Sequence, residues 1–174
     1  MIKKMEDDMS RLRALALTVV AGAVLLPSPA QAASVKGVKL VNGASGQCLT
    51  VAATEVKKNG APVIQWPCDG SRRQRWYVVK DSEGGVNFRN AVSGQCLAIA
   101  HGTSREGKRA IQWPCYRGKA PEQVWRTKAA RIKNLASGRC LAIGEGSKVK
   151  GTIAIQWRCY GGNAPEQVWH VRKH

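Results

Sequence analysis

Three copies of one short pattern run along this chain. Each copy opens with an Asn six residues before a Cys preceded by a Ser-Gly turn, continues to Ile-Gln-Trp-x-Cys, and closes with Gln-x-Trp. The first cysteines of successive copies are 48 and 44 residues apart, and all six cysteines and six tryptophans occupy equivalent positions. A repeat of this kind is one supersecondary unit that cannot bury its apolar face alone. The copies, at about residues 38–80, 86–128 and 131–172, must therefore pack on one another.

The local signals within a copy are short and extended. Runs such as Cys-Leu-Thr-Val at 48–51, Val-Ile-Gln-Trp at 63–66 and Trp-Tyr-Val-Val at 76–79 are separated by Gly, Asn and Pro. No stretch after the amino-terminal segment carries a long helical period. About four short strands per copy give about a dozen in all, which suits a closed antiparallel barrel with hairpin caps. The pattern predicts an all-β fold with pseudo-threefold symmetry.

The two cysteines of each copy lie 20, 19 and 19 residues apart. The simplest pairing that obeys the symmetry is Cys48 with Cys68, Cys96 with Cys115, and Cys140 with Cys159. Closing loops of this size contributes roughly 3 kcal/mol each in the chain-entropy model. With no Cys-x-x-Cys pair and only three histidines, the sequence predicts neither a metal site nor a cofactor.

The amino terminus has the pattern of a secretory signal peptide. Basic residues precede an apolar run from Ala14 to Leu26, and Ala30-Gln31-Ala32 is a small-residue cleavage pattern. The apolar run is shorter than the roughly 20 residues that cross a bilayer. We expect residues 1–32 to be removed, leaving one domain at 33–174 that is secreted, extracellular and monomeric, without a membrane span. Disulfides suit that oxidising environment.

Removal of residues 1–32 leaves 24 basic and 8 acidic residues, a net charge of +16. Such a charge favours polyanionic surfaces, among them anionic cell-wall or extracellular polymers, acidic glycans, lipid headgroups and nucleic acid. The positive residues are scattered through the chain. The charge therefore does not choose among these partners, indicates no specific nucleic-acid site, and is equally explained by solubility.

The three cysteine pairs in register with three Gln-x-Trp motifs resemble the ricin B-chain type β-trefoil lectins and the related carbohydrate-binding modules of bacterial hydrolases. The resemblance covers nearly all of residues 38–172 and implies a β-trefoil that binds a carbohydrate or glycan without catalysis. In that family the closing Trp packs near the threefold axis, which implies a core role for Trp76, Trp125 and Trp169. The Gln of each motif braces the loop of the candidate ligand site, at Gln74, Gln123 and Gln167.

The aromatic residue two positions before the second cysteine is the sugar-stacking platform of ricin-like sites. The resemblance places it here at Trp66, Trp113 and Trp157. An exposed indole beside polar groups is chemically suited to a sugar ring, whose C–H faces are weakly apolar. Copies two and three also share Cys-Tyr-x-Gly-x-Ala-Pro-Glu-Gln-Val-Trp. That motif adds Tyr116, Tyr160, Glu122 and Glu166 to the candidate site, or reflects a loop geometry imposed by Pro121 and Pro165.

The sequence departs from the family at the galactose-binding position. Where galactose-binding copies carry Asp two residues after the first cysteine, this chain has Thr50, Ala98 and Ala142. The usual galactose site is therefore expected to be absent from all three copies. Either the ligand is another glycan, or sugar binding has been lost and the trefoil serves as a scaffold.

Catalysis is not expected. The chain after residue 32 has eight carboxylates and three histidines, and no Gly-x-Ser-x-Gly, His-Glu-x-x-His or phosphate-loop motif. Glu122 and Glu166 are equivalent residues of different copies, so they should lie too far apart to act on one bond. The alternatives to a lectin are a basic polyanion-binding protein and, less favoured, a protease inhibitor of the trefoil type.

Overall fold

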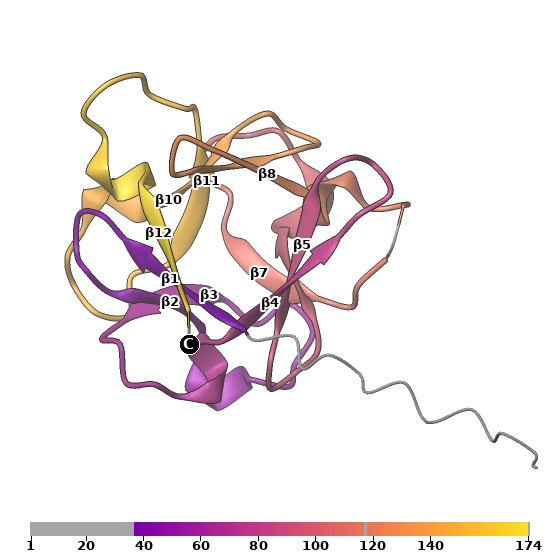
Figure 1. The fold of residues 1–174 in the computed structure, drawn as a ribbon, viewed down its shortest axis with the longest axis horizontal. Helices are drawn as coiled ribbons and strands as arrows, with labels where there is room; N and C mark the ends of the chain where they lie inside the picture. The colour runs from indigo at the N-terminus through magenta and orange to yellow at the C-terminus, as the bar shows by residue number, and fades with distance from the viewer. Residues whose placement is uncertain (1–36, 117, 174) are drawn as a thin grey trace, which may run out of the picture. The chain divides into compact units, whose positions relative to one another are not determined.

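A computed structural model describes residues 37–116 and 118–173, and the expected signal peptide lies outside them. Three groups of four strands surround a central axis (Figure 1). The first repeat contains β1 (Val38–Asn42), β2 (Cys48–Val51), β3 (Val63–Trp66) and β4 (Trp76–Lys80). The second contains β5 (Val86–Asn90), β6 (Cys96–Ile99), β7 (Ala110–Trp113) and β8 (Trp125–Lys128). The third contains β9 (Arg131–Asn134), β10 (Cys140–Ile143), β11 (Ala154–Trp157) and β12 (Trp169–Lys173).

Six of these strands form a barrel. They form the antiparallel pairs β1–β12, β4–β5 and β8–β9. One-residue pairings join β1 to β4 and β5 to β8. At the third seam the backbone N–H of Trp169 donates to the carbonyl of Ala130 at 2.8 Å. The first and last strands of the domain therefore lie side by side, and closure leaves these strands no long free edge.

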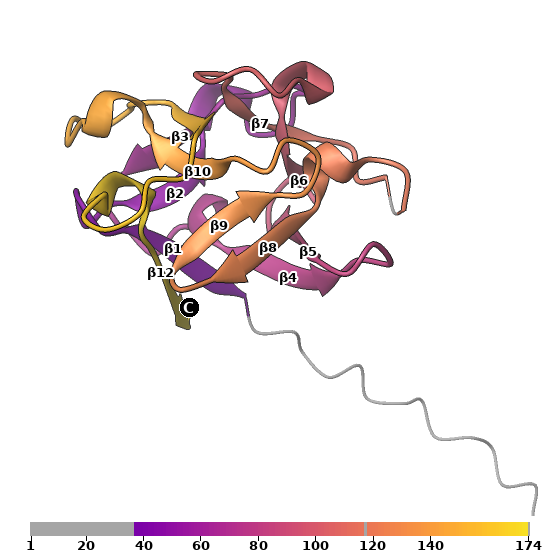
Figure 2. The same cartoon turned by 90° about the horizontal axis from the view of Figure 1, so that it is seen from above.

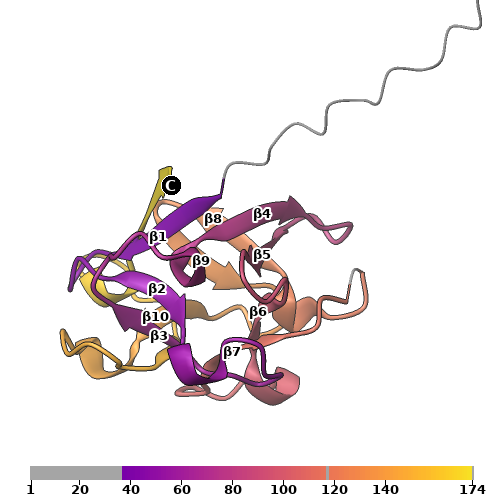
Figure 3. The ribbon, with the colours of Figure 1, turned by 90° about the horizontal axis from the view of Figure 1, so that it is seen from below.

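The other six strands form a cap of three hairpins, β2–β3, β6–β7 and β10–β11. Isolated bridges between the hairpins, such as Pro62 with Ile111 and Arg109 with Ile155, close the cap on itself. The hairpin strands occupy one layer and the barrel strands the other (Figures 2 and 3). Barrel and cap together confirm the predicted all-β trefoil.

The core lies on the axis and repeats three times. Trp76, Trp125 and Trp169 are at most 1% exposed. Their indole N–H groups donate to the carbonyls of Leu49, Leu97 and Leu141 at 3.0, 2.9 and 2.9 Å. A buried indole N–H needs such a partner, because an unpaired donor costs about 1–3 kcal/mol. The predicted core role of these tryptophans is confirmed.

A glutamine in each cap hairpin ties its repeat to a neighbouring one. Gln65, Gln112 and Gln156 are fully buried. The Gln156 side-chain amide donates to the carbonyls of Thr103 and Arg105 in the second repeat, at 2.6 and 2.8 Å. Gln65 and Gln112 make the same pair of bonds to the third and first repeats. The cap is therefore held by a cycle of buried hydrogen bonds that runs once around the axis.

Each repeat has one disulfide. The pairs are Cys48–Cys68, Cys96–Cys115 and Cys140–Cys159, the pairing that the register of the repeats predicts. Each joins the start of a hairpin to the loop beyond it. In the part of the chain that the structure describes, no helix is long and apolar enough to cross a membrane.

Candidate functional site

Two hollows open beside the cap hairpins, one in the third repeat and one in the second. The repeat-3 cavity has a volume of about 640 Å³, and its lining includes Ala142, Glu145, Trp157, Tyr160, Glu166 and Gln167. The repeat-2 cavity measures about 810 Å³, and its lining includes Ala98, His101, Lys108, Arg109, Trp113 and Glu122. The two share equivalent positions of the repeat, so they are copies of one site with different side chains.

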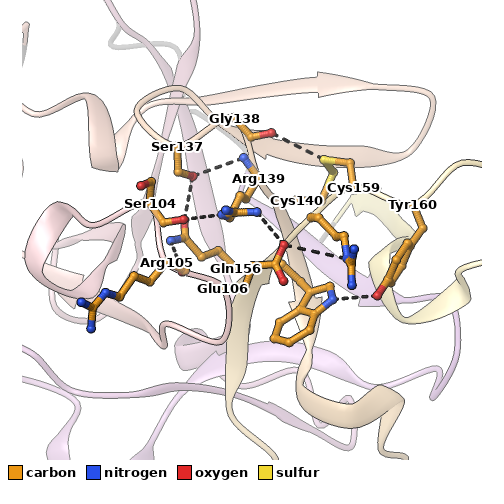
Figure 4. Close-up of polar contacts among 12 residues, drawn as sticks. Ser104, Arg105, Glu106, Ser137, Gly138, Arg139, Cys140, Gln156, Cys159 and Tyr160 are labelled. Atoms are coloured by element: carbon orange, nitrogen blue, oxygen red, sulfur yellow. Dashed lines mark hydrogen bonds and ion pairs between the residues drawn. A yellow bond between two sulfur atoms is a disulfide. The ribbon is translucent and has the colours of Figure 1, made fainter.

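In the repeat-3 cavity two aromatic residues form an ordered corner. Trp157 ends β11, and Tyr160 follows the disulfide-bonded Cys159. The Trp157 indole N–H donates to the Tyr160 hydroxyl at 2.8 Å (Figure 4). The indole also lies against Gly107 of the second repeat. If that glycine carried a Cβ atom, the atom would lie 3.5 Å from Trp157 Cζ3. These contacts fix the indole before any ligand arrives, which lowers the entropic cost of binding.

The glutamines of the Gln-x-Trp motifs hold the loops around the aromatic residues. Gln167 is fully buried. Its amide donates to the Arg158 carbonyl at 2.8 Å and its side-chain oxygen accepts from the Tyr160 backbone N–H at 3.0 Å. Gln74 and Gln123 are equally buried and make the equivalent pairs of bonds. Both polar ends of each side chain are thus engaged within the protein.

The candidate glutamates lie on short 3-10 helices that begin with proline, η4 (Pro121–Gln123) and η6 (Pro165–Gln167). The asparagine that opens each following repeat holds the glutamate backbone. Asn134 donates from its side chain to the Glu122 carbonyl at 2.8 Å, and Asn42 to the Glu166 carbonyl at 2.9 Å. Both asparagines are 1% exposed. The asparagine of the repeat pattern thus orients a residue of a neighbouring copy, which is the third repeat for Asn42 and the second for Asn134.

Besides Lys108 and Arg109 in the repeat-2 cavity, the sequence interpretation missed one equivalent residue at each cavity. His101 lines the repeat-2 cavity and Glu145 the repeat-3 cavity. Both adopt left-handed backbone conformations, with φ of 61° and 56°. Such a conformation costs a non-glycine residue roughly 1–2 kcal/mol, and strain of this kind clusters at functional sites. The signal in the sequence was the glycine after each of them, in the segments that follow the two Cys-Leu-Ala-Ile strands.

The second repeat lacks the ordered aromatic corner. Trp113 is 38% exposed and Tyr116 is 52% exposed. Among the described residues no hydrogen bond joins them, and Tyr116 is not part of the cavity lining. The cavity wall instead carries Lys108 and Arg109, which correspond to Thr152 and Ile153 of the third repeat.

The first repeat places different groups at the same positions. The Lys150 ammonium of the third repeat lies 5.4 Å from the ring centroid of Trp66, within cation–π range. Asp69 and Arg73 stand where the third repeat has Tyr160 and Glu166, and they form an ion pair at 3.7 Å. Partial burial raises the pKa of Asp69, but hydrogen bonds from Ser71 and the Arg73 charge outweigh it, so the pKa lies below its usual value of 3.8.

The residues at the family's galactose-binding position are buried. Ala98 and Ala142 are each 2% exposed and belong to the walls of the repeat-2 and repeat-3 cavities. Thr50 is fully buried, and its hydroxyl donates to the Val51 carbonyl at 3.3 Å. None of the three provides a carboxylate. In the described residues no group of three or more His, Cys, Asp or Glu side chains is arranged to hold a metal ion.

An ionic bridge joins the second and third repeats beside the repeat-3 cavity. One Glu106 carboxylate oxygen lies 2.7 Å from the Arg139 guanidinium and 3.9 Å from that of Arg158 (Figure 4). Arg139 also donates to the Ser104 carbonyl. The Arg158 guanidinium lies 5.6 Å from the Tyr160 ring centroid. The loop that carries Gly107 is therefore anchored to the repeat whose cavity it lines.

Solved structures share this fold. A designed threefold-symmetric protein, ThreeFoil, is 27% identical with a TM-score of 0.73, covering 79% of this chain and 99% of that one. An exo-β-1,3-galactanase from Clostridium thermocellum is 28% identical with a TM-score of 0.72, and the match covers 80% of this chain but only 30% of the galactanase. A ricin B-like lectin from Macrolepiota procera, at 21% identity and a TM-score of 0.66, shows the fold alone; its match covers 83% of this chain and 99% of the lectin.

A comparison with curated protein sequences found no match. The family model of the ricin-type β-trefoil lectin domain matches residues 36–169. That match spans the three repeats, their disulfides and both cavities. The chain belongs to the ricin-type β-trefoil lectin domain family.

Proposed function

We propose that this protein is a secreted, non-catalytic carbohydrate-binding domain that holds sugar rings in its repeat-2 and repeat-3 cavities. The observation that carries the proposal is the repeat-3 cavity of about 640 Å³, in which Trp157, tied to Tyr160, stands beside the Glu166 carboxylate. An indole offers an apolar surface to the C–H groups of a sugar, and a carboxylate accepts hydrogen bonds from its hydroxyls.

Family membership supports the same proposal. The Macrolepiota procera lectin was solved in complex with lactose, and an earthworm R-type lectin domain in complex with GalNAc. Three disulfides are in keeping with an extracellular, oxidising location. The alanines at positions 98 and 142 make simple galactose a poor ligand, because they offer no hydrogen-bond acceptor from the side chain.

The first repeat differs from the two cavities in the groups around its tryptophan. We assign no sugar platform to Trp66, because Lys150 lies over its ring and the Asp69–Arg73 ion pair occupies the neighbouring positions. Gln74, Gln123 and Gln167 act by bracing the loops, since both ends of each amide are already hydrogen-bonded inside the protein.

The test is a glycan panel probed with the parent protein, the Trp113→Ala, Trp157→Ala double variant, and Trp66→Ala as the matched control. We expect the double variant to lose at least about tenfold in affinity for every sugar ligand, about 1.4 kcal/mol, while Trp66→Ala keeps parental affinity. Both cavities must be altered together, because the intact one would mask the loss through avidity.

The panel is run at low and high salt. Sugar binding that survives high salt supports the lectin assignment, because salt screens surface charges over a Debye length of about 8 Å at physiological strength. Binding only to anionic polymers, lost in salt and untouched by the double variant, would replace the lectin assignment with a polyanion-binding one.

A further inference from the structure

The two cavities have opposite charge. The repeat-3 cavity is lined by two carboxylates, Glu145 and Glu166, and by no Lys, Arg or His among the described residues. The repeat-2 cavity is lined by Lys108 and Arg109 against the single carboxylate of Glu122, with His101 at the position of Glu145. With histidine neutral, the lining charge is −2 in the third repeat and +1 in the second.

The acidic cavity is an exception on a basic protein. The full chain has 28 basic residues and only 11 acidic ones. Glu166 lies close to Gly146, the residue after Glu145. If Gly146 carried a Cβ atom, the atom would lie 3.9 Å from Glu166 Cβ. Two carboxylates that line one space favour a cation in that space.

The backbone at Glu145 is strained, as it is at the equivalent His101 of the repeat-2 cavity. A φ of 56° is a conformation that glycine adopts freely and glutamate adopts at a cost. The equivalent residue of the first repeat, Ala53, lies in a 3-10 helix and is not among the residues with positive φ. The strained conformation therefore accompanies the cavities and is not a requirement of the repeat.

The aromatic residues of the repeat-3 cavity are the second group that can contact a ligand there. Trp157 and Tyr160 form one wall of the same cavity and are joined by their hydrogen bond. An aromatic ring attracts an ammonium group as well as the apolar face of a sugar. The Arg158 guanidinium already lies 5.6 Å from the Tyr160 ring centroid, so this attraction is assigned to the Trp157 indole. Resting on the proposed function, we infer that the repeat-3 cavity selects sugars that carry a free primary amine, with the ring against Trp157 and the ammonium between Glu145 and Glu166.

The probes are short glucosamine oligosaccharides and their fully N-acetylated counterparts, which share the ring and differ in charge. Binding is followed by NMR of the ¹⁵N-labelled protein with its disulfides intact, because the indole N–H signals of Trp157 and Trp113 report the two cavities separately. We expect the Trp157 signal to report about tenfold higher affinity for the amine form than for the N-acetylated form, because the ammonium group adds two partly exposed ion pairs.

The Glu145→Gln, Glu166→Gln variant should abolish that preference, because it keeps the shape of the cavity and removes its charge. Glu83→Gln, in the β4–β5 turn, removes a carboxylate outside the cavity lining and should leave the preference intact. Raising the pH until the sugar amine loses its proton should also remove it.

The outcomes separate the two proposals. Equal affinity of the amine and N-acetylated forms at Trp157 would overturn the amine preference and leave the carbohydrate-binding proposal standing. A preference that persists in the double glutamine variant would show that the carboxylates do not cause it. If neither oligosaccharide nor any sugar of the glycan panel shifts Trp157 or Trp113, both proposals are wrong.

Discussion

The first and third repeats have the same frame and different sites. Both have a disulfide, a buried Gln bracing the preceding loop, and a buried Trp whose indole donates to a leucine carbonyl. Beside that frame, the third repeat places Tyr160 and Glu166 at an open cavity, whereas the first places Asp69 and Arg73 in an ion pair at 3.7 Å.

The comparison separates the residues that stabilise the trefoil from the residues that face the cavities. Positions that fill the axis or brace the loops keep their residue type in all three copies, because the barrel and cap require them three times. Polar positions at the cavities, such as those of Tyr160 and Glu166, do not fill the core, so each copy is free to differ there. The first repeat therefore shares the structural residues of the third and differs from it at positions 69 and 73, which correspond to Tyr160 and Glu166.

The largest expected effect distinguishes frame from site within the second repeat. Trp125→Ala should lower the free energy of unfolding by about 3–5 kcal/mol, because it leaves a cavity on the axis. Trp113→Ala should lower it by less than about 1 kcal/mol, since Trp113 is 38% exposed. Thermal and denaturant unfolding of the disulfide-bonded proteins measure both. Equal losses for the two variants would contradict the division between core and platform tryptophans.

A smaller effect concerns backbone strain inside and outside the site. Ala130, in the β8–β9 turn, has a φ of 58°, close to the 56° of Glu145. Substitution by glycine relieves roughly 1–2 kcal/mol of left-handed strain and costs roughly 0.5–1 kcal/mol of chain entropy. Ala130→Gly and Glu145→Gly should therefore each raise unfolding free energy by about 0.5–1 kcal/mol, as measured by chemical denaturation.

Sugar affinity separates these two variants. Ala130→Gly should bind sugars as the parent does, because the β8–β9 turn lies outside both cavities. Glu145→Gly should weaken binding at Trp157, because it removes a carboxylate from the repeat-3 cavity. A stabilised Glu145→Gly variant with unchanged affinity would show that the strain has no function in binding.

The smallest effect tests the ion pair of the first repeat. The pKa of Asp69 is lowered in the folded protein. The ionised side chain therefore adds to the free energy of unfolding above its unfolded-state pKa of about 4, and this stabilisation is lost as the pH falls through the folded-state pKa. Because Asp69 is largely exposed, Asp69→Asn should reduce stability at pH 7 by less than about 1 kcal/mol. Unfolding measured from pH 7 to pH 2 should show the two proteins converging in acid. A constant difference would contradict the pKa argument.

Much of the candidate site was predictable, because it follows the register of the repeat. The resemblance to ricin-type lectins indicated Trp113 and Trp157, and the motif shared by copies two and three indicated Tyr160, Glu122 and Glu166. The structure places each of them at a cavity. Tyr116 shares the motif of Tyr160 but does not line the repeat-2 cavity. A shared motif predicted an equivalent position there, although the side-chain contacts of the two copies differ.

Two of the residues that sequence reasoning missed lie at the cavities because of their backbone conformation. His101 and Glu145 carry no motif of their own, and their left-handed conformation appears only once the hairpins and loops are built. The acidic character of one cavity and the basic character of the other were likewise hidden in a net charge of +17 for the whole chain.

The sequence alone determined an all-β fold with pseudo-threefold symmetry and the disulfide pairing, because copies repeated in register must pack their apolar positions on one another. The resemblance to ricin-type lectins added the trefoil and the axial role of the closing tryptophans. Only the tertiary structure decided which side chains surround each platform tryptophan. Lys150 of the third repeat lies over Trp66 of the first. The physical reason is that barrel closure brings loops of one copy against the hairpin of another, and such contacts between copies depend on side chains that the repeat pattern does not constrain.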